Sequence, residues 1–557
     1  SIKYLLLILR ADNRGEGGIL ALATLGSDTA TRGKLLFRLG LFGAALLYAD
    51  GMITPAITVM GAIDGLHIAT PLFDPYVIPL AVAVLIGLFW FQSSGTTKVG
   101  RVFGPVTLLW FLVLSLLGIH QIARAPEILA AVNPLHGVAF FVNNGWVGFV
   151  VLGAVFLVVT GGEALYADIG HFGTTPIRLT WFAVVLPGLV LNYFGQGALL
   201  LREPVAAENP FYLMAPPWAL YPLVILSTAA AVMASQAIIS GAFSLTMQAI
   251  QLGYCPRLRV FYTSAQIIGQ VYVPVVNWGL MIACIGLVLG FGSATNLAAA
   301  YGVAIAATML ITTILFYVVA RRRWRWPIAV ALPIAAFFVV IDVLFFGANM
   351  LKIFHGGWFP LLVSGVILFF MLTWRKGRKM LGLRMKEMTV PLELFIGDCG
   401  TQRIQRVAGT SVFMSGNSKG APLALLHNLK HNKVLHKQVV VLTVITEESP
   451  YVSERDRRVE LEKLPEGFWR LKLHYGFMER PDVPAALARI KDPVLQFHPM
   501  KTTYFIGRET VLSTKRPDLS RWRGAIFAWM TRNTGDVTSY FGLPPNGVVE
   551  LGARVEV

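Results

Sequence analysis

LFRLGLFGAALLYADGMITPAITVMGA (residues 36–62) is the stretch of sequence that decides the fold. A helix that crosses a bilayer needs about 20 mainly apolar residues, and this run exceeds that length with only Arg38 and Asp50 charged. Comparable runs follow at residues 76–93, 103–122, 146–167, 179–200, 218–248, 273–291, 296–319, 328–350 and 358–374. The sequence therefore predicts an all-α polytopic membrane protein with ten full spans, preceded by a partial apolar segment at residues 2–9.

The composition of the 557-residue chain supports a membrane protein. Hydrophobic residues make up 55% and charged residues 14%, whereas soluble domains carry about 25% charged residues. The net charge of +17 fits loops that face a cytoplasm and anionic lipid. We expect no nucleic-acid partner, because the basic residues do not form a stripe interleaved with stacking aromatics. The three cysteines lie far apart and offer neither a disulfide framework nor a CxxC metal site.

Lysine and arginine in the short loops predict the orientation of the spans. If residues 10–38 are cytoplasmic, the inside loops carry 14 Lys and Arg residues, whereas the outside loops carry only Arg124, Arg202 and Lys352. Positive residues accumulate on the cytoplasmic side of membrane proteins. We therefore expect a multi-pass protein of the inner (cytoplasmic) membrane, with everything after Arg375 in the cytoplasm.

The composition changes abruptly at TWRKGRK (373–379), where long apolar runs end. This change divides the chain into a transmembrane transport domain at 1–375 and a small cytoplasmic α/β regulatory domain at 376–557. Alternation and β-branched content predict strands at 438–445, 468–477, 502–512 and 547–557, and helices at 481–492 and after 519. HNLKHNKVLH (427–436) is interpreted as one basic helix with a solvated or docking face, which is favoured over the alternative of a metal site because no Cys or acidic ligand lies nearby. The domain is expected to regulate transport by docking on the transport core or by forming a homodimer.

Three carboxylates lie inside apolar spans, namely Asp50, Glu163 and Asp342. A charged group near the bilayer centre costs several kcal/mol, about 2.5–3.5 on insertion scales, so such groups usually face a cavity, a partner or an ion. For Asp342, a structural role, either neutral or paired with a basic residue of another helix, and a functional role are equal alternatives.

Helix-breaking and hydroxyl residues accompany the other two carboxylates. Gly161 and Gly162 follow Thr160 where a helix would otherwise cross the midplane, and glycine there allows carbonyls to turn into a cavity. Pro55 frees a carbonyl one turn earlier in its helix, and Asp50, Thr54 and Thr58 share one helix face. Such oxygens suit a hard monovalent cation. The alternative is that these small residues only permit close helix packing.

Other chemistry finds little support in the sequence. Neither a GxxxxGK[ST] phosphate loop nor an HExxH motif occurs, and GTSVFMSG (409–416) lacks the GxSxG spacing of serine hydrolases. We expect no enzymatic activity and no cofactor. A potassium channel is disfavoured because a TVGYG-like filter is missing from the sequence.

Several ordered motifs resemble the KUP/HAK/KT family of potassium uptake proteins. They include RADNRGEGGILALATL (10–25), YADGMITPAITVMGAIDGL (48–66), TGGEALYADIGHFG (160–173), LNYFGQGALLL (191–201) and NLAAAYG (296–302). The similarity extends from the first residue to Val557.

The resemblance implies a leucine-transporter-like core of two inverted repeats and a cytoplasmic C-terminal domain. It also implies potassium import coupled to protons. The family's broken first helix, with its Gly-Asp-Ile-Gly-Thr-Ser-Pro motif, has no counterpart here. The chain opens at Ser1 inside what resembles the second family helix. We therefore expect a truncated sequence whose full form has twelve spans and contributes further groups to the ion site.

The family's acidic residue in the third helix corresponds to Asp50, its broken sixth helix to residues 160–163, and its aspartate in the eleventh helix to Asp342. The resulting hypothesis is a potassium–proton symporter that works by alternating access. Potassium is expected at Asp50, Thr54, Thr58 and Thr160, and proton coupling at Glu163 and Asp342. The alternative is an amino-acid or polyamine transporter of the related APC type.

Overall fold

A computed structural model describes residues 1–13, 15–26, 31–94, 96–167, 169–262, 271–387, 389–401, 404–447, 449, 451–452, 459–490, 492–498, 500–512 and 520–556. The chain forms two compact units. The first consists of Ser1–Leu245 and Val260–Leu368, and the second of Thr246–Arg259 and Phe369–Val557. The division falls inside two long helices, α12 and α16, so each of them contributes residues to both units.

Within the described residues, ten helical segments are long and apolar enough to cross a membrane, which confirms the predicted number of full spans. Their principal helices are α2 (Thr31–Ile63), α4 (Val77–Phe91), α5 (Thr96–Arg124), α6 (Leu135–Val155), α10 (Leu186–Arg202), α12 (Leu220–Gln251), α13 (Pro274–Phe291), α14 (Ala294–Arg322), α15 (Ile328–Met350) and α16 (Trp358–Glu387).

Shorter elements connect these helices or extend them. At the start of the chain, the partial apolar segment forms a π-helical turn, η1 (Ile2–Leu7), followed by the 3-10 turn η2 (Ile8–Arg10) and α1 (Ile19–Gly26). The remaining ones are α3 (Gly65–Ala69), η3 (Pro71–Tyr76), η4 (Gln92–Ser94), η5 (Pro126–Val132), η6 (Phe156–Val159), α7 (Gly162–Ala167), α8 (Ile169–Phe172), α9 (Thr174–Thr180), η7 (Trp181–Val185), η8 (Pro204–Glu208), α11 (Pro210–Leu213), η9 (Pro217–Ala219), η10 (Ile353–His355) and a short hairpin of β1 (Phe261–Tyr262) and β2 (Val271–Tyr272).

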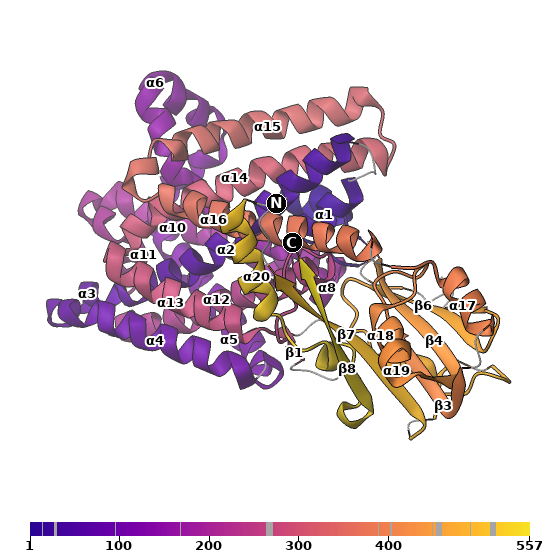
Figure 1. Ribbon diagram of the computed structural model, residues 1–557. Coiled ribbons are helices and arrows are strands. Elements are labelled where there is room, and N and C mark those ends of the chain that lie inside the picture. Colours follow the sequence, from indigo (N-terminus) through magenta and orange to yellow (C-terminus); the bar gives the residue numbers. More distant parts are fainter. Residues whose placement is uncertain are drawn as a thin grey trace. The chain divides into compact units, whose positions relative to one another are not determined.

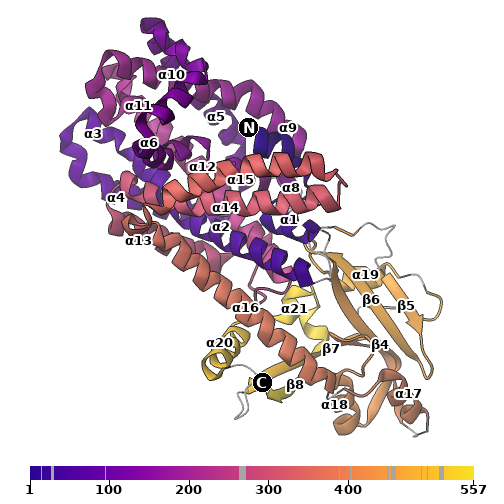
Figure 2. The ribbon, with the colours of Figure 1, turned by 90° about the horizontal axis from the view of Figure 1, so that it is seen from above.

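Helix α14 is the core of the first unit. In its most apolar stretch 78% of the residues are buried, against 11% in α5. It packs against α2 on one side and α15 on the other, and both ribbon views place these helices together (Figures 1 and 2). Its small residues, among them Ala300, Ala304 and Ala307, permit this close approach.

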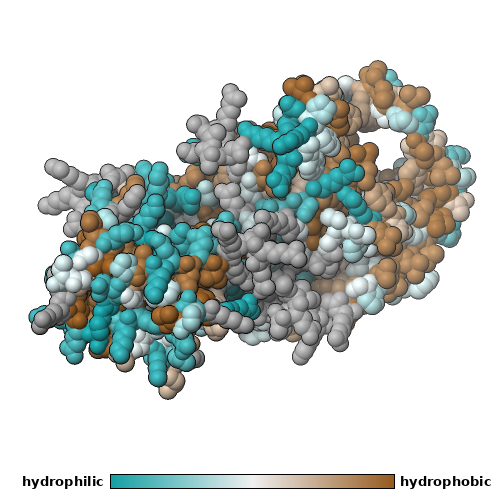
Figure 3. Space-filling view, turned by 90° about the vertical axis from the view of Figure 1, so that its right-hand side faces the viewer, coloured by the Kyte–Doolittle hydropathy of each residue, from teal (hydrophilic) through white to brown (hydrophobic). Residues whose placement is uncertain are grey.

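The outer helices of this unit expose apolar side chains. Leu108, Leu112 and Leu116 on α5 and Phe337 and Val340 on α15 are all exposed. Hydrophobic residues also gather over part of the surface in Figure 3, apart from regions where hydrophilic residues dominate. Exposed apolar faces of this extent indicate contact with lipid rather than water.

The second unit contains a six-stranded sheet in the order β5-β6-β4-β3-β7-β8. Among the strands that the structure describes in this sheet, only β5 is antiparallel to its neighbour. The strands are β3 (Gln405–Met414), β4 (Val434–Glu447), β5 (Val459–Lys463), β6 (Phe468–Gly476), β7 (Thr502–Leu512) and β8 (Val548–Glu556). The helices are α17 (Leu392–Thr401), α18 (Leu423–Asn432), α19 (Val483–Ala488), α20 (Arg521–Arg532) and α21 (Val537–Tyr540), with the 3-10 turn η11 (Pro545–Gly547) before β8.

Alternate residues of β4 face two different cores. Val439 and Val441 pack with side chains from α17 and α18, whereas Val440 and Leu442 pack with side chains from α19 and the segment after α21. A sheet buried on both faces explains the continuous apolar run at 438–445. The arrangement of these elements can be followed in Figure 1.

One expectation for this unit is wrong, and one central strand was missed. HNLKHNKVLH is not one helix, because α18 ends at Asn432 and Lys433 adopts a left-handed conformation with φ 58°. His427 and His431 therefore lie on α18, whereas His436 lies on β4. Strand β3, the central strand of the parallel set, was not predicted.

An ion-pair network lies along one edge of the sheet. Arg470 on β6 donates hydrogen bonds to Glu393 on α17 and to Glu462 on β5. The bond from Arg470 lowers the pKa of Glu393 below its usual value. Since both carboxylates are largely exposed, the network contributes little to stability.

Candidate functional site

One face of α2 carries a chain of hydrogen-bonded oxygens. Asp50, 2% exposed, accepts a hydrogen bond of 2.6 Å from the hydroxyl of Thr54 at its Oδ1. The hydroxyl of Thr58 donates to the backbone carbonyl of Thr54 at 2.7 Å and lies 3.2 Å from the hydroxyl of Ser235 on α12. The i, i+4 spacing predicted from the sequence thus brings Asp50, Thr54 and Thr58 together, and Ser235 adds an oxygen from a distant part of the chain.

Pro55 lies inside α2 without ending the helix. The backbone carbonyls of Gly51 and Met52, which lie one turn before it, face the thiol of Cys284 on α13 at 3.9 Å and 3.0 Å. The carbonyl that Pro55 frees is therefore directed at α13 and not at the oxygens of Asp50 and Thr54. The proline contributes to helix packing in this structure rather than to the hydroxyl face.

The fourth span of this chain, which corresponds to the family's sixth helix, is broken where the sequence predicts it. The 3-10 turn η6 ends at Val159, Thr160 is extended with ψ 171°, and Gly161 has φ +93° before α7 begins at Gly162. Only glycine adopts such a positive φ without strain. The break consequently requires Gly161 and leaves the backbone of Thr160 and Gly161 outside any helix.

Glu163 stands in the first turn of α7, next to this break. The side chain is 6% exposed, and its Oε1 accepts a hydrogen bond of 3.2 Å from the backbone N–H of Gly161. The other oxygen, Oε2, is buried and has no hydrogen-bond partner within the described part of the chain. Because an unpartnered buried carboxylate oxygen is costly, this atom indicates a place for a cation or a proton.

Tyr301 on α14 links the two halves of the site and was not predicted. Its phenol lies close to the hydroxyls of Thr160 and Thr54, and it is close enough to Asp50 and Glu163 to interact electrostatically. The residue lies within the motif NLAAAYG, and a phenol inside an apolar span was the signal available in the sequence. Hydroxyl and carboxylate oxygens of α2, α7, α14 and the unwound segment therefore converge, as a hard cation requires.

The third membrane carboxylate, Asp342 on α15, belongs to a different cluster. Its Oδ1 and Oδ2 accept from the ammonium of Lys3 on η1 at 2.8 Å and 2.7 Å, and Oδ2 also accepts from the hydroxyl of Thr313 at 2.5 Å. Of the two alternatives that the sequence left open for Asp342, the structure contains the pair with a basic residue. Asp342 thus does not lie on the hydrogen-bonded face of Asp50 and Thr54.

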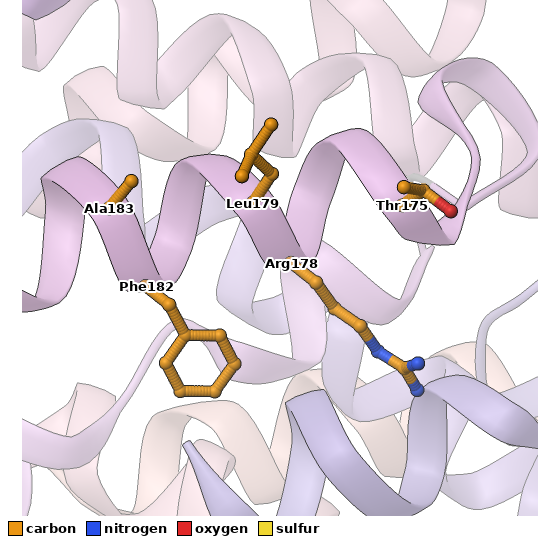
Figure 4. Close-up of a pocket in the computed structure, with 5 residues that line it drawn as sticks. All are labelled: Thr175, Arg178, Leu179, Phe182 and Ala183. Carbon is orange, nitrogen blue, oxygen red and sulfur yellow. The ribbon is translucent and has the colours of Figure 1, made fainter.

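A separate hollow of about 550 Å³ lies along α9 and η7. Figure 4 shows its five lining residues on one helical segment, with the side chain of Arg178 directed towards the start of the chain, where its Nε donates to the carbonyl of Leu5 at 2.8 Å. None of the candidate ion-site residues lines this hollow. Arg178 is the one charged residue among the five that line it, and the hollow is not part of the candidate ion site.

Comparison with known proteins shows the family of the chain. Residues 1–379 match the family model of the K+ potassium transporter integral membrane domain, and residues 408–557 match that of the K+ potassium transporter C-terminal domain. The chain is 54% identical to the "Probable potassium transport system protein Kup" of Myxococcus xanthus, over the whole chain and 86% of that protein. It is 56% identical to the "Probable potassium transport system protein Kup 1" of Geobacter sulfurreducens, over the whole chain and 89% of that protein. The chain therefore belongs to the Kup (KUP/HAK/KT) family of potassium transporters.

Proposed function

We propose that this multi-pass membrane protein takes up potassium by proton-coupled symport, with alternating access to a site formed by α2, the break before α7, and α14. The observation that carries the proposal is the buried, unpartnered Oε2 of Glu163 beside the broken span. Family membership and the names of the relatives support potassium as the ion.

In this proposal, Asp50 provides the countercharge for potassium, and Thr54, Thr58 and Thr160 provide neutral oxygens. The hydrogen bond from Thr54 holds the Asp50 carboxylate in a fixed direction, which reduces the reorganisation that ion binding requires. The extended backbone at Thr160 supports this assignment, because carbonyls outside a helix are free to coordinate an ion.

Glu163 is proposed to carry the coupled proton. One oxygen is fixed by the backbone of Gly161, and the other is free to bind a proton or to interact with the ion. An inside-negative potential favours each inward-moving positive charge by about 2.3 kcal/mol per 100 mV, so one coupled proton doubles the electrical drive. Asp342, the second carboxylate predicted for coupling, is held by Lys3, and its contribution is considered in the next subsection.

We further propose the leucine-transporter-like inverted-repeat core, an inner-membrane location with the C-terminus in the cytoplasm, and a regulatory role for residues 376–557, through docking or a homodimer. One contact supports regulation. Within the second unit, Tyr540 donates a hydrogen bond of 2.8 Å to Gln251 at the end of α12, and the guanidinium of Arg257 lies 4.9 Å from the Tyr540 ring centroid. Since α12 also carries Ser235, one continuous helix joins this contact to the candidate ion site.

The test is uptake into proteoliposomes that contain a pH-sensitive dye and a potassium-sensitive dye. Potassium entry with simultaneous acidification is expected, and potassium entry without proton entry would refute symport. Asp50→Asn and Glu163→Gln are each expected to abolish or strongly reduce uptake. Normal uptake in both variants would remove the site assignment.

A further inference from the structure

The cluster around Lys3 is fully bonded. The ammonium donates to Asp342 Oδ1 at 2.8 Å, to Asp342 Oδ2 at 2.7 Å and to the backbone carbonyl of Met309 at 2.9 Å. An ammonium has three N–H groups, so all of its donors are used. The side chain of Lys3 is 10% exposed and that of Asp342 is 1% exposed, which makes this a buried ion pair that joins η1, α14 and α15.

The pair adjoins the candidate ion site. The ring of Tyr4, the residue after Lys3, packs so closely on α7 that a Cβ at Gly162 would lie 2.9 Å from it. Glu163 follows Gly162 directly, and the charges of Lys3 and Glu163 are close enough to interact. The ammonium is therefore bonded to one membrane carboxylate and acts electrostatically on another.

We propose that Lys3 is a resident cation that permanently occupies Asp342 and so confines the transported potassium and proton to Asp50 and Glu163. The assignment rests on the proposed function, and it makes Lys3 and Asp342 positioning residues that act on the ion site through charge. Asp342 then takes part in coupling only by holding Lys3, because both of its oxygens already accept hydrogen bonds from the Lys3 ammonium and Oδ2 also accepts one from Thr313.

The two members of the pair have opposite effects on the site. Without Asp342, the ammonium remains near Glu163 with no countercharge and competes with potassium for the site. Without Lys3, a third buried carboxylate becomes open to a cation, which holds potassium and slows its release. A pair that served only to hold η1 against α15 would not give effects of opposite sign on potassium affinity.

The experiment compares Lys3→Gln, Asp342→Asn and the double variant in proteoliposomes, with Lys3→Arg as the charge-conserving control. Asp342→Asn is expected to raise the KM for potassium about tenfold or more, because breaking a buried pair leaves a charge uncompensated. Lys3→Gln is expected to leave KM equal or lower and to reduce kcat. In the double variant a neutral amide pair replaces the ions, so its KM is expected to stay within about threefold of the parent value by the same charge argument. The KM of Lys3→Arg, which keeps the charge, should stay within the same range.

Size-exclusion chromatography of each variant identifies those that fail to fold. If one single variant fails to fold, the KM values of the double variant and of Lys3→Arg still test the proposal. The proposal is overturned if both single variants shift KM in the same direction, or if the double variant is as impaired as the worse single one. Asp50→Asn, measured in the same assay, tests the ion site independently. A parental KM for Asp50→Asn would refute the proposed function whatever the behaviour of the Lys3 pair.

Discussion

At Asp50, a buried carboxylate is stabilised by a hydroxyl one helical turn away. Thr54 supplies that hydroxyl, and a hydrogen bond to a charged group contributes about 1.5–3 kcal/mol. Thr58 differs, because its hydroxyl is bonded to a backbone carbonyl and lies near Ser235. The two threonines therefore share a helix face but hold different partners.

This difference predicts unequal effects of removing each hydroxyl. Thr54→Val is expected to raise the KM for potassium about tenfold or more, since Asp50 loses a charge-assisted hydrogen bond. Thr54→Ser keeps the donor and should stay within about threefold of the parent, and Thr58→Val should lie between the two because its hydroxyl bonds no carboxylate. Initial rates of potassium entry into proteoliposomes measure all three. Equal KM values for Thr54→Val and Thr54→Ser would show that the hydroxyl has no such role.

The residues that the sequence could and could not predict differ in one physical respect. Asp50, Thr54 and Thr58 are neighbours along one helix, and helix periodicity alone places them together. Tyr301, Ser235 and Lys3 reach their partners only through packing between distant helices. Lys3 in particular lies 339 positions from Asp342, and spacing holds no information about such a contact.

At the scale of elements, glycine has two different roles: one in the broken span before α7, and one where α16 packs against α20. Gly161 adopts a positive φ, so its role is conformational. Gly377 on α16 has a different role, because a Cβ there would lie 2.2 Å from the ring of Phe527 on α20. Trp374 packs on the same ring at 5.5 Å between centroids, and these residues form a small core within the second unit.

Gly377→Val is therefore expected to displace α20 from α16, whereas Gly382→Val, five residues further along the same helix, has open space at its Cβ. Overpacking of a tight contact costs about 1–3 kcal/mol. Valine has a slightly higher helix propensity than glycine at both positions, so the two variants differ only in packing. Limited proteolysis of the full-length protein, read by mass spectrometry, should show faster cleavage around 520–532 in Gly377→Val alone. Matching cleavage patterns in the two variants would contradict this account of the contact.

The sequence predicted helices correctly where an apolar run was long enough to cross the membrane. It failed where a helix is followed directly by a strand, and where a glycine interrupts the alternation of a strand. The ten spans were predicted because each exceeds the bilayer thickness with few charges. In HNLKHNKVLH the helix ends at a left-handed lysine, a conformation that sequence patterns assign to glycine or asparagine and not to lysine. Strand β3 was missed because Gly409, with φ +108°, lies at a shift in its pairing with β4 and interrupts the alternation.

For the whole molecule, the charge asymmetry of the loops and the two compact units lead to one expectation about orientation. The inside loops defined by the sequence carry 14 lysine and arginine residues against three in the outside loops, and this bias predicts that the second unit lies in the cytoplasm. Val205, on the short turn between α10 and α11, is 90% exposed and falls in a loop assigned to the outside. Met500, before β7, is 97% exposed and falls in the unit assigned to the cytoplasm.

Single-cysteine variants at these two positions test the orientation. In a background with Cys255, Cys284 and Cys399 replaced by alanine, a membrane-impermeant maleimide applied to intact cells should label Val205→Cys and leave Met500→Cys unlabelled. After the membrane is permeabilised, both should react, because both side chains are exposed. Labelling of Met500→Cys in intact cells would reverse the orientation. It would also place the second unit, for which we propose a regulatory role, on the side from which potassium enters, where it could not respond to the potassium concentration inside the cell.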